Sequence, residues 1–185
     1  MDVFEAIFTR RSVSKMRPDP VSRDLIERLL AAAVQAPNHY RVRPWRFYVV
    51  SGEARHRLGE VMAQSLLARQ PDSPPSALEK ERSRPLRAPV LIAISVDAPS
   101  EPKVLEVENI CAAAAAAENM LLAAHGLGLG AMWRTGPASM NPDVKAFFGL
   151  GPEQHLIGFI YVGYPLEESS APERPSYEDR TTWME

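Results

Sequence analysis

The chain has 185 residues, of which 45% are hydrophobic and 24% charged, and its formal net charge is −2. These values are typical of one folded domain with a sizeable core, and a charge so close to zero gives no electrostatic reason to expect nucleic acid as a partner. The single cysteine, Cys111, excludes an intrachain disulfide. No apolar run is long enough to span a membrane and no signal peptide opens the sequence, so we expect no membrane partner and a cytoplasmic location.

A short basic segment follows the first predicted helix. Asp2 is placed to begin that helix, and its apolar face consists of Val3, Phe4, Ile7 and Phe8. Arg10, Arg11 and Ser12 come directly after it. Guanidinium groups offer permanently charged, forked donors that suit phosphate or carboxylate, and a hydroxyl adds a neutral donor. By itself such a run is more often a solvated basic turn, so the pattern leaves both interpretations open.

Apolar spacing predicts that helices and strands alternate along the rest of the chain. Runs with helical spacing indicate helices, and short runs rich in β-branched residues indicate strands. The helices are expected over 23–36, 53–69, 104–125 and from 139 or 141 to 148, and the strands over 45–50, 88–96, 127–133 and 156–164. The order indicates a mixed α and β domain spanning residues 1–185.

Two stretches are too polar to form a core. Prolines 71, 74, 75 and 85 frame residues 70–85, which we expect to be a mobile loop and a candidate lid. Residues 167–185 are polar, contain Pro172 and Pro175, and are expected to form an extended tail.

The sequence has no recognisable hydrolytic or metal-binding motif. Its four histidines are scattered, and neither a metal-ligand spacing, a GxSxG elbow nor a Walker loop is present. The glycine-rich segment 126–130 follows a helix instead of a strand, which is the wrong order for a dinucleotide-binding turn. We therefore predict no metal ligand and no catalytic side chain.

Two further clusters could contact a ligand. Residues 36–39 (APNH) end a helix with several donors and acceptors, although a plain turn is the commoner explanation. Residues 131–136 (AMWRTG) end a strand with an aromatic, a cation, a hydroxyl and a glycine. Ligands often bind where strands end, but a core tryptophan beside a surface arginine would look the same.

Taken in order, five markers resemble the FMN-dependent nitroreductase family. They are RRSV, a helix ending in APNH before a PW strand, a long helix of small residues, GLGAMWRTG, and a final GFIYVGYP strand. The similarity runs from Val3 to about Pro165 and is greatest to the small subgroup with a WRSG-type motif. It implies an α+β sandwich with a central, mainly antiparallel sheet flanked by helices. It also implies an intertwined homodimer with FMN at the subunit interface.

The resemblance assigns cofactor contacts by motif. It implies that Arg10, Arg11 and Ser12 hold the phosphate and the pyrimidine edge of FMN, and that Gln35 and His39 reach the flavin from the partner chain. It further implies that Trp133, Arg134 and Thr135 line the flavin, and that a tail residue, Arg174, lies near the phosphate. A segment aligned with nicotinamide binding consists of Ala123, Ala124, His125, Gly126, Leu127 and Gly128.

The implied activity is an NAD(P)H-dependent reduction of nitroaromatics, quinones or related electrophiles through bound FMN. A flavin performs such redox chemistry itself, which agrees with the missing catalytic motifs. The chain departs from the subgroup at Thr135, where serine is usual, and at Asn38, where aspartate is common. A flavin carrier or sensor without turnover is the alternative, and a reduced-flavin enzyme for dehalogenation or ring cleavage is a third reading.

Overall fold

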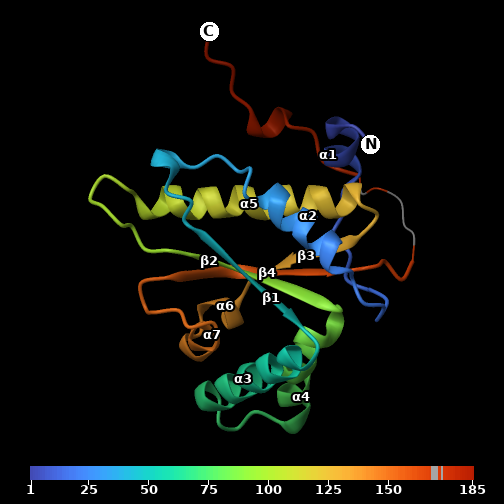
Figure 1. Cartoon of the computed structure of the whole chain (residues 1–185), viewed down its shortest axis with the longest axis vertical. Helices are drawn as coiled ribbons and strands as arrows, with labels where there is room; N and C mark the ends of the chain where they lie inside the picture. Colours follow the sequence, from blue (N-terminus) through green and yellow to red (C-terminus); the bar gives the residue numbers. More distant parts are fainter. Residues whose placement is uncertain (168–170, 172) are drawn as a thin grey trace.

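The computed structural model describes residues 1–167, 171 and 173–185, and its described part is built around one four-stranded sheet (Figure 1). The strands are β1 (Trp45–Ser51), β2 (Val90–Val96), β3 (Gly130–Arg134) and β4 (His155–Gly163), in the spatial order β1-β2-β4-β3. All three pairings are antiparallel. The architecture is the α+β sandwich expected from the sequence.

Solvent is excluded from the centre of the sheet because its middle strands are covered on both faces. Every residue of β2 is buried, as its continuous apolar sequence predicts. At Gly158 of β4, an added Cβ would lie 2.5 Å from the Arg134 carbonyl oxygen, and the residue has a φ of +135°. Only glycine allows β3 to approach β4 at this point.

Two helices cover one face of the sheet. They are α2 (Arg23–Ala33) and α5 (Glu106–Gly126), and α5 lies over the sheet, roughly along β4 in this view (Figure 1). Fully buried alanines, including Ala113, Ala116 and Ala117, form the inner side of α5. Small side chains let a helix lie close to a sheet, and the isoleucines and valines of β2 and β4 complete this half of the core.

The opposite face carries a second helical layer. It contains α3 (Glu53–Arg69), α4 (Pro75–Ser83), the 3₁₀ turn η2 (Arg84–Arg87), α6 (Pro137–Met140) and α7 (Pro142–Phe147). Phe148 packs here against Tyr48 and Phe159. Of the two expected starts for the helix ending near 148, Asn141 is confirmed: it caps α7 by accepting from the N–H groups of Asp143 and Val144, whereas Ser139 belongs to the separate helix α6.

Residues 75–83 form α4, where the sequence indicated a loop. Proline is favourable at the first helical position, since its missing N–H would be unpaired there, and Pro75 occupies that position. Gly59 of α3 lets the helices pack closely, because a Cβ there would lie 2.3 Å from the Arg82 carbonyl oxygen. Arg82 Nε also donates to both carboxylate oxygens of Glu60, at 3.0 and 3.1 Å.

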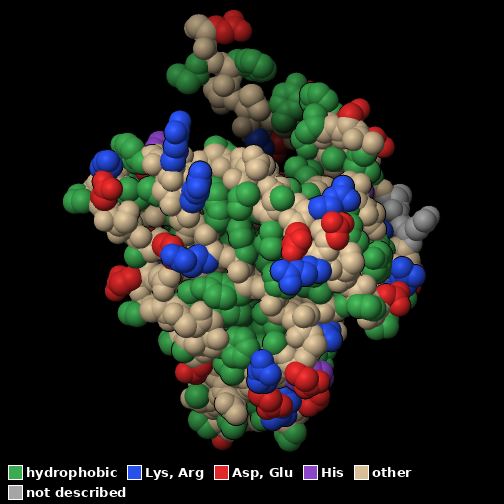
Figure 2. Space-filling model, viewed as in Figure 1, with side chains coloured by type: hydrophobic (Ala, Val, Ile, Leu, Met, Phe, Trp, Pro, Cys, Tyr) green, Lys and Arg blue, Asp and Glu red, His purple; other side chains and the backbone are tan. Residues whose placement is uncertain are grey.

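Three peripheral segments complete the described chain: α1 (Val3–Thr9), η1 (His39–Arg41) and a tail with η3 (Glu178–Arg180). The apolar face of α1 is exposed, with Phe4 at 67% and Phe8 at 66%. Trp183 in the tail is 77% exposed. Figure 2 shows hydrophobic side chains gathered on α1 and along the protruding tail. Exposed apolar surface of this kind is typical of interaction sites.

Among the described residues, no helix is both long and apolar enough to cross a bilayer. Part of the expected tail, residues 168–170 and 172, lies outside the described residues.

Candidate functional site

The basic segment after α1 is attached to the edge of the sheet. The N–H of Val13 donates to the carbonyl oxygen of Ala131 in β3 at 3.0 Å, and Ser12 forms a parallel bridge with Ala131. Gly130 makes this approach feasible, because a Cβ there would lie 2.9 Å from Cγ1 of buried Val13. The rigid sheet thus fixes where Arg10 and Arg11 lie.

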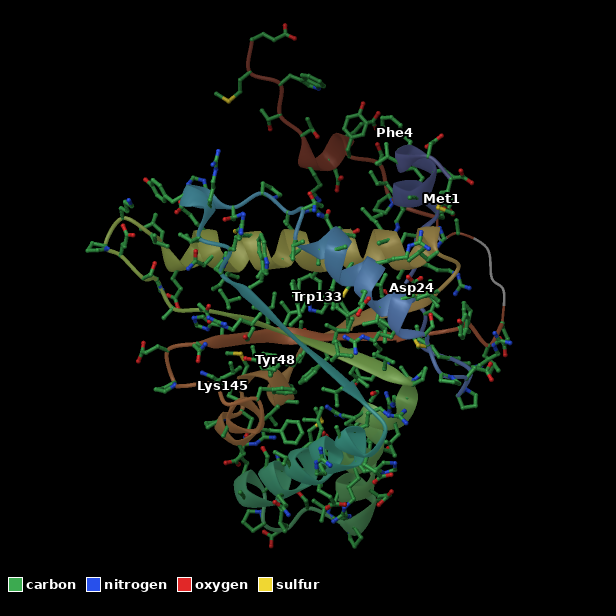
Figure 3. All side chains as sticks on the ribbon, viewed as in Figure 1. Met1, Phe4, Asp24, Tyr48, Trp133 and Lys145 are labelled. Carbon is green, nitrogen blue, oxygen red and sulfur yellow. The ribbon has the colours of Figure 1, made fainter. Side chains whose placement is uncertain are left out.

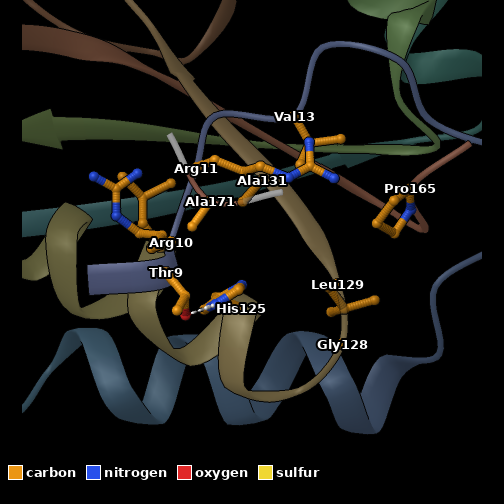
Figure 4. Close-up of a pocket in the computed structure, with 11 residues that line it drawn as sticks. Thr9, Arg10, Arg11, Val13, His125, Gly128, Leu129, Ala131, Pro165 and Ala171 are labelled. Atoms are coloured by element: carbon orange, nitrogen blue, oxygen red, sulfur yellow. Dashed lines mark hydrogen bonds between the residues drawn. The ribbon is translucent and has the colours of Figure 1, made fainter. Parts of the chain in front are cut away.

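A pocket of about 420 Å³ opens beside this segment. Figure 4 shows Thr9 beside His125, which belongs to the last turn of α5, with Arg10 and Arg11 above them and Gly128 in the turn that follows α5. Two predicted clusters that lie far apart in the sequence therefore meet in one place.

Arg10 has an unused donor in this pocket. Its Nε lies 3.1 Å from Glu118 Oε1, yet the two atoms are not aligned for a hydrogen bond, and this buried Nε has no hydrogen-bond partner among the described residues. Arg174 Nη2 donates to the Arg10 carbonyl oxygen at 3.3 Å, and Arg11 Nη2 donates to that of Glu167 at 3.3 Å. The basic segment thus carries a second arginine, Arg11, contacts a third through its backbone, Arg174, and leaves one buried N–H of Arg10 unpaired, a set of donors that suits an anionic ligand.

His125 is held as a neutral donor at the same pocket. The Thr9 hydroxyl donates to the Glu5 carbonyl oxygen at 2.6 Å, so its only proton is used. His125 Nε2, at 2.7 Å from the same hydroxyl, must then donate to it, which fixes the proton on Nε2. Burial, followed by the nearby charges of Arg10 and Arg11, lowers the pKa of His125 below its usual 6.5.

The outer edge of β3 is open beyond the segment that contains Ser12. Backbone groups in a strand alternate in direction, and those of Ala131 point outward toward Val13. The backbone N–H and C=O groups of Trp133 therefore also point outward, and by the same alternation so do those of Thr135, two residues further on. No described strand pairs with this edge. The edge thus presents free N–H and C=O groups to a ligand.

The side chains of the AMWRTG motif point to different sides of β3. Trp133 packs against the core below α5 and donates from Nε1 to the Ile157 carbonyl oxygen at 3.2 Å (Figure 3). Arg134 lies on the other face, with its guanidinium carbon 5.4 Å from the centre of the Tyr161 ring. Thr135 is exposed.

Arg134 and Thr135 border a second pocket, of about 450 Å³, between β3, β4 and α4. Lys80, Arg84 and Arg87 line it as well. Burial raises the pKa of the Tyr161 phenol, while the charges of Arg134, Arg87 and Arg84 oppose the shift. Sequence reasoning missed the three cations of 80–87, because no local motif indicates that this segment lies against β3.

His39 lies far from the His125 end of the Arg10 pocket within one chain. His39 Nδ1 is 3.3 Å from Glu108 Oε1 in the first turn of α5, whereas Thr9 contacts His125 in its last turn. At 1.5 Å per residue, Glu108 and His125 are separated by about 25 Å. The Gln35 side chain donates to the Ala31 carbonyl oxygen at 3.4 Å. One chain does not bring His39 to the His125 end of the pocket.

The segment aligned with nicotinamide binding forms the end of α5 and the turn after it. His125 and Gly128 line the Arg10 pocket. Ala124 is fully buried, and Leu127 packs against the core. Only part of this segment is accessible to a ligand.

These observations describe an α+β sandwich with an anion pocket and an open strand edge beside it. The Nitroreductase family profile matches residues 7–164. The chain belongs to this family, as the ordered motifs indicated.

Similar proteins agree with that assignment. The putative NAD(P)H nitroreductase YdjA of Escherichia coli is 32% identical over 92% of both chains. Among solved structures, a nitroreductase-like protein from Bacillus cereus has a TM-score of 0.86 and 25% identity, covering 100% of this chain and 97% of its own. A putative nitroreductase from Desulfovibrio desulfuricans, in complex with FMN, has a TM-score of 0.75 and 27% identity, covering 96% and 94%.

Proposed function

We propose that this chain is an FMN-dependent NAD(P)H oxidoreductase that reduces nitroaromatics, quinones or related electrophiles. The observation that carries the proposal is the buried, unpaired Nε of Arg10, in a segment that also carries Arg11, contacts Arg174 and lies against β3, whose outer edge is open in the described chain. A phosphate monoester is a doubly charged acceptor that such a cluster would bind. The FMN complex of the Desulfovibrio relative supports FMN as the bearer of that phosphate.

In this proposal the chain binds and orients the cofactor. Arg10, Arg11 and Arg174 hold the phosphate, with Ser12 beside them. The outward N–H of Thr135 donates to the ring system. Bound FMN supplies the transfer of a hydride from nicotinamide and of electrons to a second substrate. Reduction by the nicotinamide coenzyme and oxidation by the second substrate would follow one another, so ping-pong kinetics are expected.

We further propose a homodimer in which Gln35 and His39 of one chain complete the flavin site of the other. The separation of about 25 Å along α5 supports this arrangement for His39, since one chain alone cannot bring His39 to His125. A two-fold axis that packs α5 antiparallel against its copy would bring the first turn of one helix to the last turn of the other. The outward side of α5 suits such packing, because it is largely small and apolar: Val107, Cys111, Ala114, Ala115 and Leu122.

The nicotinamide coenzyme would approach the pocket from the end of α5. Within the aligned segment, His125, Gly126 and Gly128 offer accessible surface, whereas Ala123, Ala124 and Leu127 support the turn. Titration with NADH and with NADPH in separate experiments measures which coenzyme reduces the flavin.

The test is the visible spectrum of the purified protein followed by titration under argon. A flavin spectrum that bleaches with NADH or NADPH and returns on addition of a nitroarene supports the oxidoreductase. A yellow protein that neither coenzyme bleaches is instead a flavin carrier or sensor. A protein that stays colourless after incubation with FMN contradicts both readings.

A further inference from the structure

The pocket beneath Arg134 carries an excess of positive charge. Four cations line it, namely Lys80, Arg84, Arg87 and Arg134. Glu81 pairs with Arg84 at 2.9 Å. In the described part of the chain, Lys80, Arg87 and Arg134 have no carboxylate within 4.0 Å. Clustered like charges repel one another, so this arrangement is stabilised when an anion enters.

The cations are carried by packed elements. Lys80 is on α4, which the contact between Arg82 and Glu60 fixes to α3, and Pro85 between the two arginines of η2 is buried. Arg134 belongs to β3. Arg82 points to α3 and does not line the pocket, so the remaining cations are a distinct set directed at one cavity.

The rest of the lining suits an aromatic ring. Met62, Met132, Phe159 and Tyr161 supply apolar surface, and burial keeps the Tyr161 phenol protonated as a donor. The pocket also includes Thr135, at the strand edge proposed above to face the flavin ring. A flat molecule bound here would have its anionic group on α4 and η2 and its body toward that edge.

We propose that this pocket binds the electron acceptor and that Lys80, Arg87 and Arg134 select aromatic acceptors that carry a carboxylate. The inference rests on the proposed oxidoreductase function and specifies its substrate class. For a nitrobenzoate, the nitro group takes two electrons and two protons and loses one oxygen as water. The balanced reaction is ArNO₂ + NAD(P)H + H⁺ → ArNO + NAD(P)⁺ + H₂O, and the carboxylate is unchanged.

The test compares 4-nitrobenzoate with neutral 4-nitrobenzamide in the FMN-loaded enzyme. Selectivity is the ratio of their kcat/KM values, and the wild type should favour the acid. Because the side chains of 80 and 87 are exposed, each change, Lys80→Gln or Arg87→Gln, should lower this ratio about threefold, and the double variant about tenfold. Lys80→Arg and Arg87→Lys keep the charge and should keep the ratio.

Arg57→Gln is the matched control. Arg57 is exposed on α3 and lines none of the pockets described here, so its loss removes the same charge without changing the ratio. Equal flavin content and equal thermal midpoints across the variants show that folding and cofactor loading are intact.

A readout without turnover separates this inference from the proposed function. Calorimetric titration of the same protein preparations with benzoate and with benzamide measures the pocket directly, whether or not a nicotinamide reduces the flavin. The wild type should bind benzoate more tightly, and the double variant should lose that preference. Loss of coenzyme-driven turnover with the benzoate preference intact contradicts only the oxidoreductase.

Two results overturn the inference. One is an unchanged selectivity ratio and benzoate affinity in the double variant. The other is a rise in KM for NADH or NADPH instead of the acid, which would assign the cations to the phosphates of the coenzyme. Ping-pong kinetics allow the two KM values to be measured independently.

Discussion

Arg10 combines two features that seldom occur together in an exposed N-terminal segment. Its Nε is buried without a hydrogen bond in the described chain, and its backbone carbonyl is already used by Arg174. Glu118, at 3.1 Å, neutralises part of its charge without satisfying that N–H. A bound phosphate would supply the missing acceptor, so most of the contribution of Arg10 should appear on binding and little in the folding of the apoprotein.

Arg10→Ala should therefore weaken FMN binding by about 1.5–3 kcal/mol, the usual contribution of a hydrogen bond to a charged group. This corresponds to a dissociation constant about 10- to 150-fold higher. Fluorescence titration of apoprotein with FMN measures it. Arg17→Ala, which removes an exposed arginine paired with Asp19, is the control. If Arg10→Ala retains its flavin through dialysis as well as wild type, the phosphate assignment is wrong.

His125 makes the stability of the apoprotein depend on pH. Its pKa is lowered in the folded chain, first by burial and then by Arg10 and Arg11, while Glu5 opposes the shift. Above pH 6.5 the ring is neutral in both states and the stability is at its full value. As the pH falls through 6.5, the unfolded chain takes up the proton first, so stability falls until the folded pKa is reached.

Replacing His125 with glutamine should flatten this dependence. Glutamine can still donate to Thr9 but does not titrate. Urea unfolding of apoprotein between pH 7.5 and 5.5 should show a smaller loss in His125→Gln than in wild type. His56→Gln, at an exposed position on α3, should behave as wild type. An identical pH slope in His125→Gln and wild type would show that other groups cause the dependence.

At the scale of elements, the contact between residues 10–13 and β3 determines whether the anion pocket forms. Gly130 and Val13 meet at a distance that leaves no room for a methyl group. Gly130→Ala should displace the segment, cost about 1–3 kcal/mol of stability, as overpacking usually does, and weaken FMN binding.

A double variant tests this mechanism. Val13→Ala removes two of the atoms that the new methyl would meet, Cγ1 at 2.9 Å and Cγ2 at 3.3 Å, and leaves Cβ at 3.0 Å, so Gly130→Ala with Val13→Ala should recover part of the FMN affinity lost in Gly130→Ala alone. Gly151→Ala, where the nearest atom would be 4.0 Å away, is the control. Additive losses in the double variant would mean that the close contact does not position the segment.

The main elements could be predicted from the sequence because their signals are local. The apolar runs of β2 and β4 and the spacing in α2 and α5 identified these elements within a few residues. The helix α4 could not be predicted from the sequence, since Pro71, Pro74 and Pro75 together are typical of a loop. Only the packing against Gly59 shows that Pro75 begins a helix.

At the scale of the whole molecule, one chain leaves too much apolar surface exposed. The face of α1, the outward side of α5 and Trp183 all lack cover in the described chain. The sequence predicted Arg10 and Arg11 as a site because they share a motif. It could not locate the cations of residues 80–87 beside Arg134, because that proximity depends on how α4 packs.

A negative charge introduced on the outward side of α5 should dissociate the proposed dimer into monomers. Ala115→Glu places a carboxylate in the middle of the small-residue stripe and should shift the mass in light scattering from about twice 20.5 kDa to 20.5 kDa. The same variant should lose FMN, since His39 of the partner subunit would be removed from the site. Ala68→Glu, at an exposed position near the end of α3, should remain a dimer. A monomeric wild type would contradict the shared site.

The open edge of β3 has a consequence for the fate of the protein in the cell. Unpaired strand edges are templates for sheet-to-sheet aggregation, and natural proteins usually cover them. If FMN covers this edge, the cofactor acts as a cap against self-association as well as a redox group. Cells starved of riboflavin should then accumulate the protein in inclusion bodies. Cells grown with added riboflavin should contain it in the soluble fraction of the lysate.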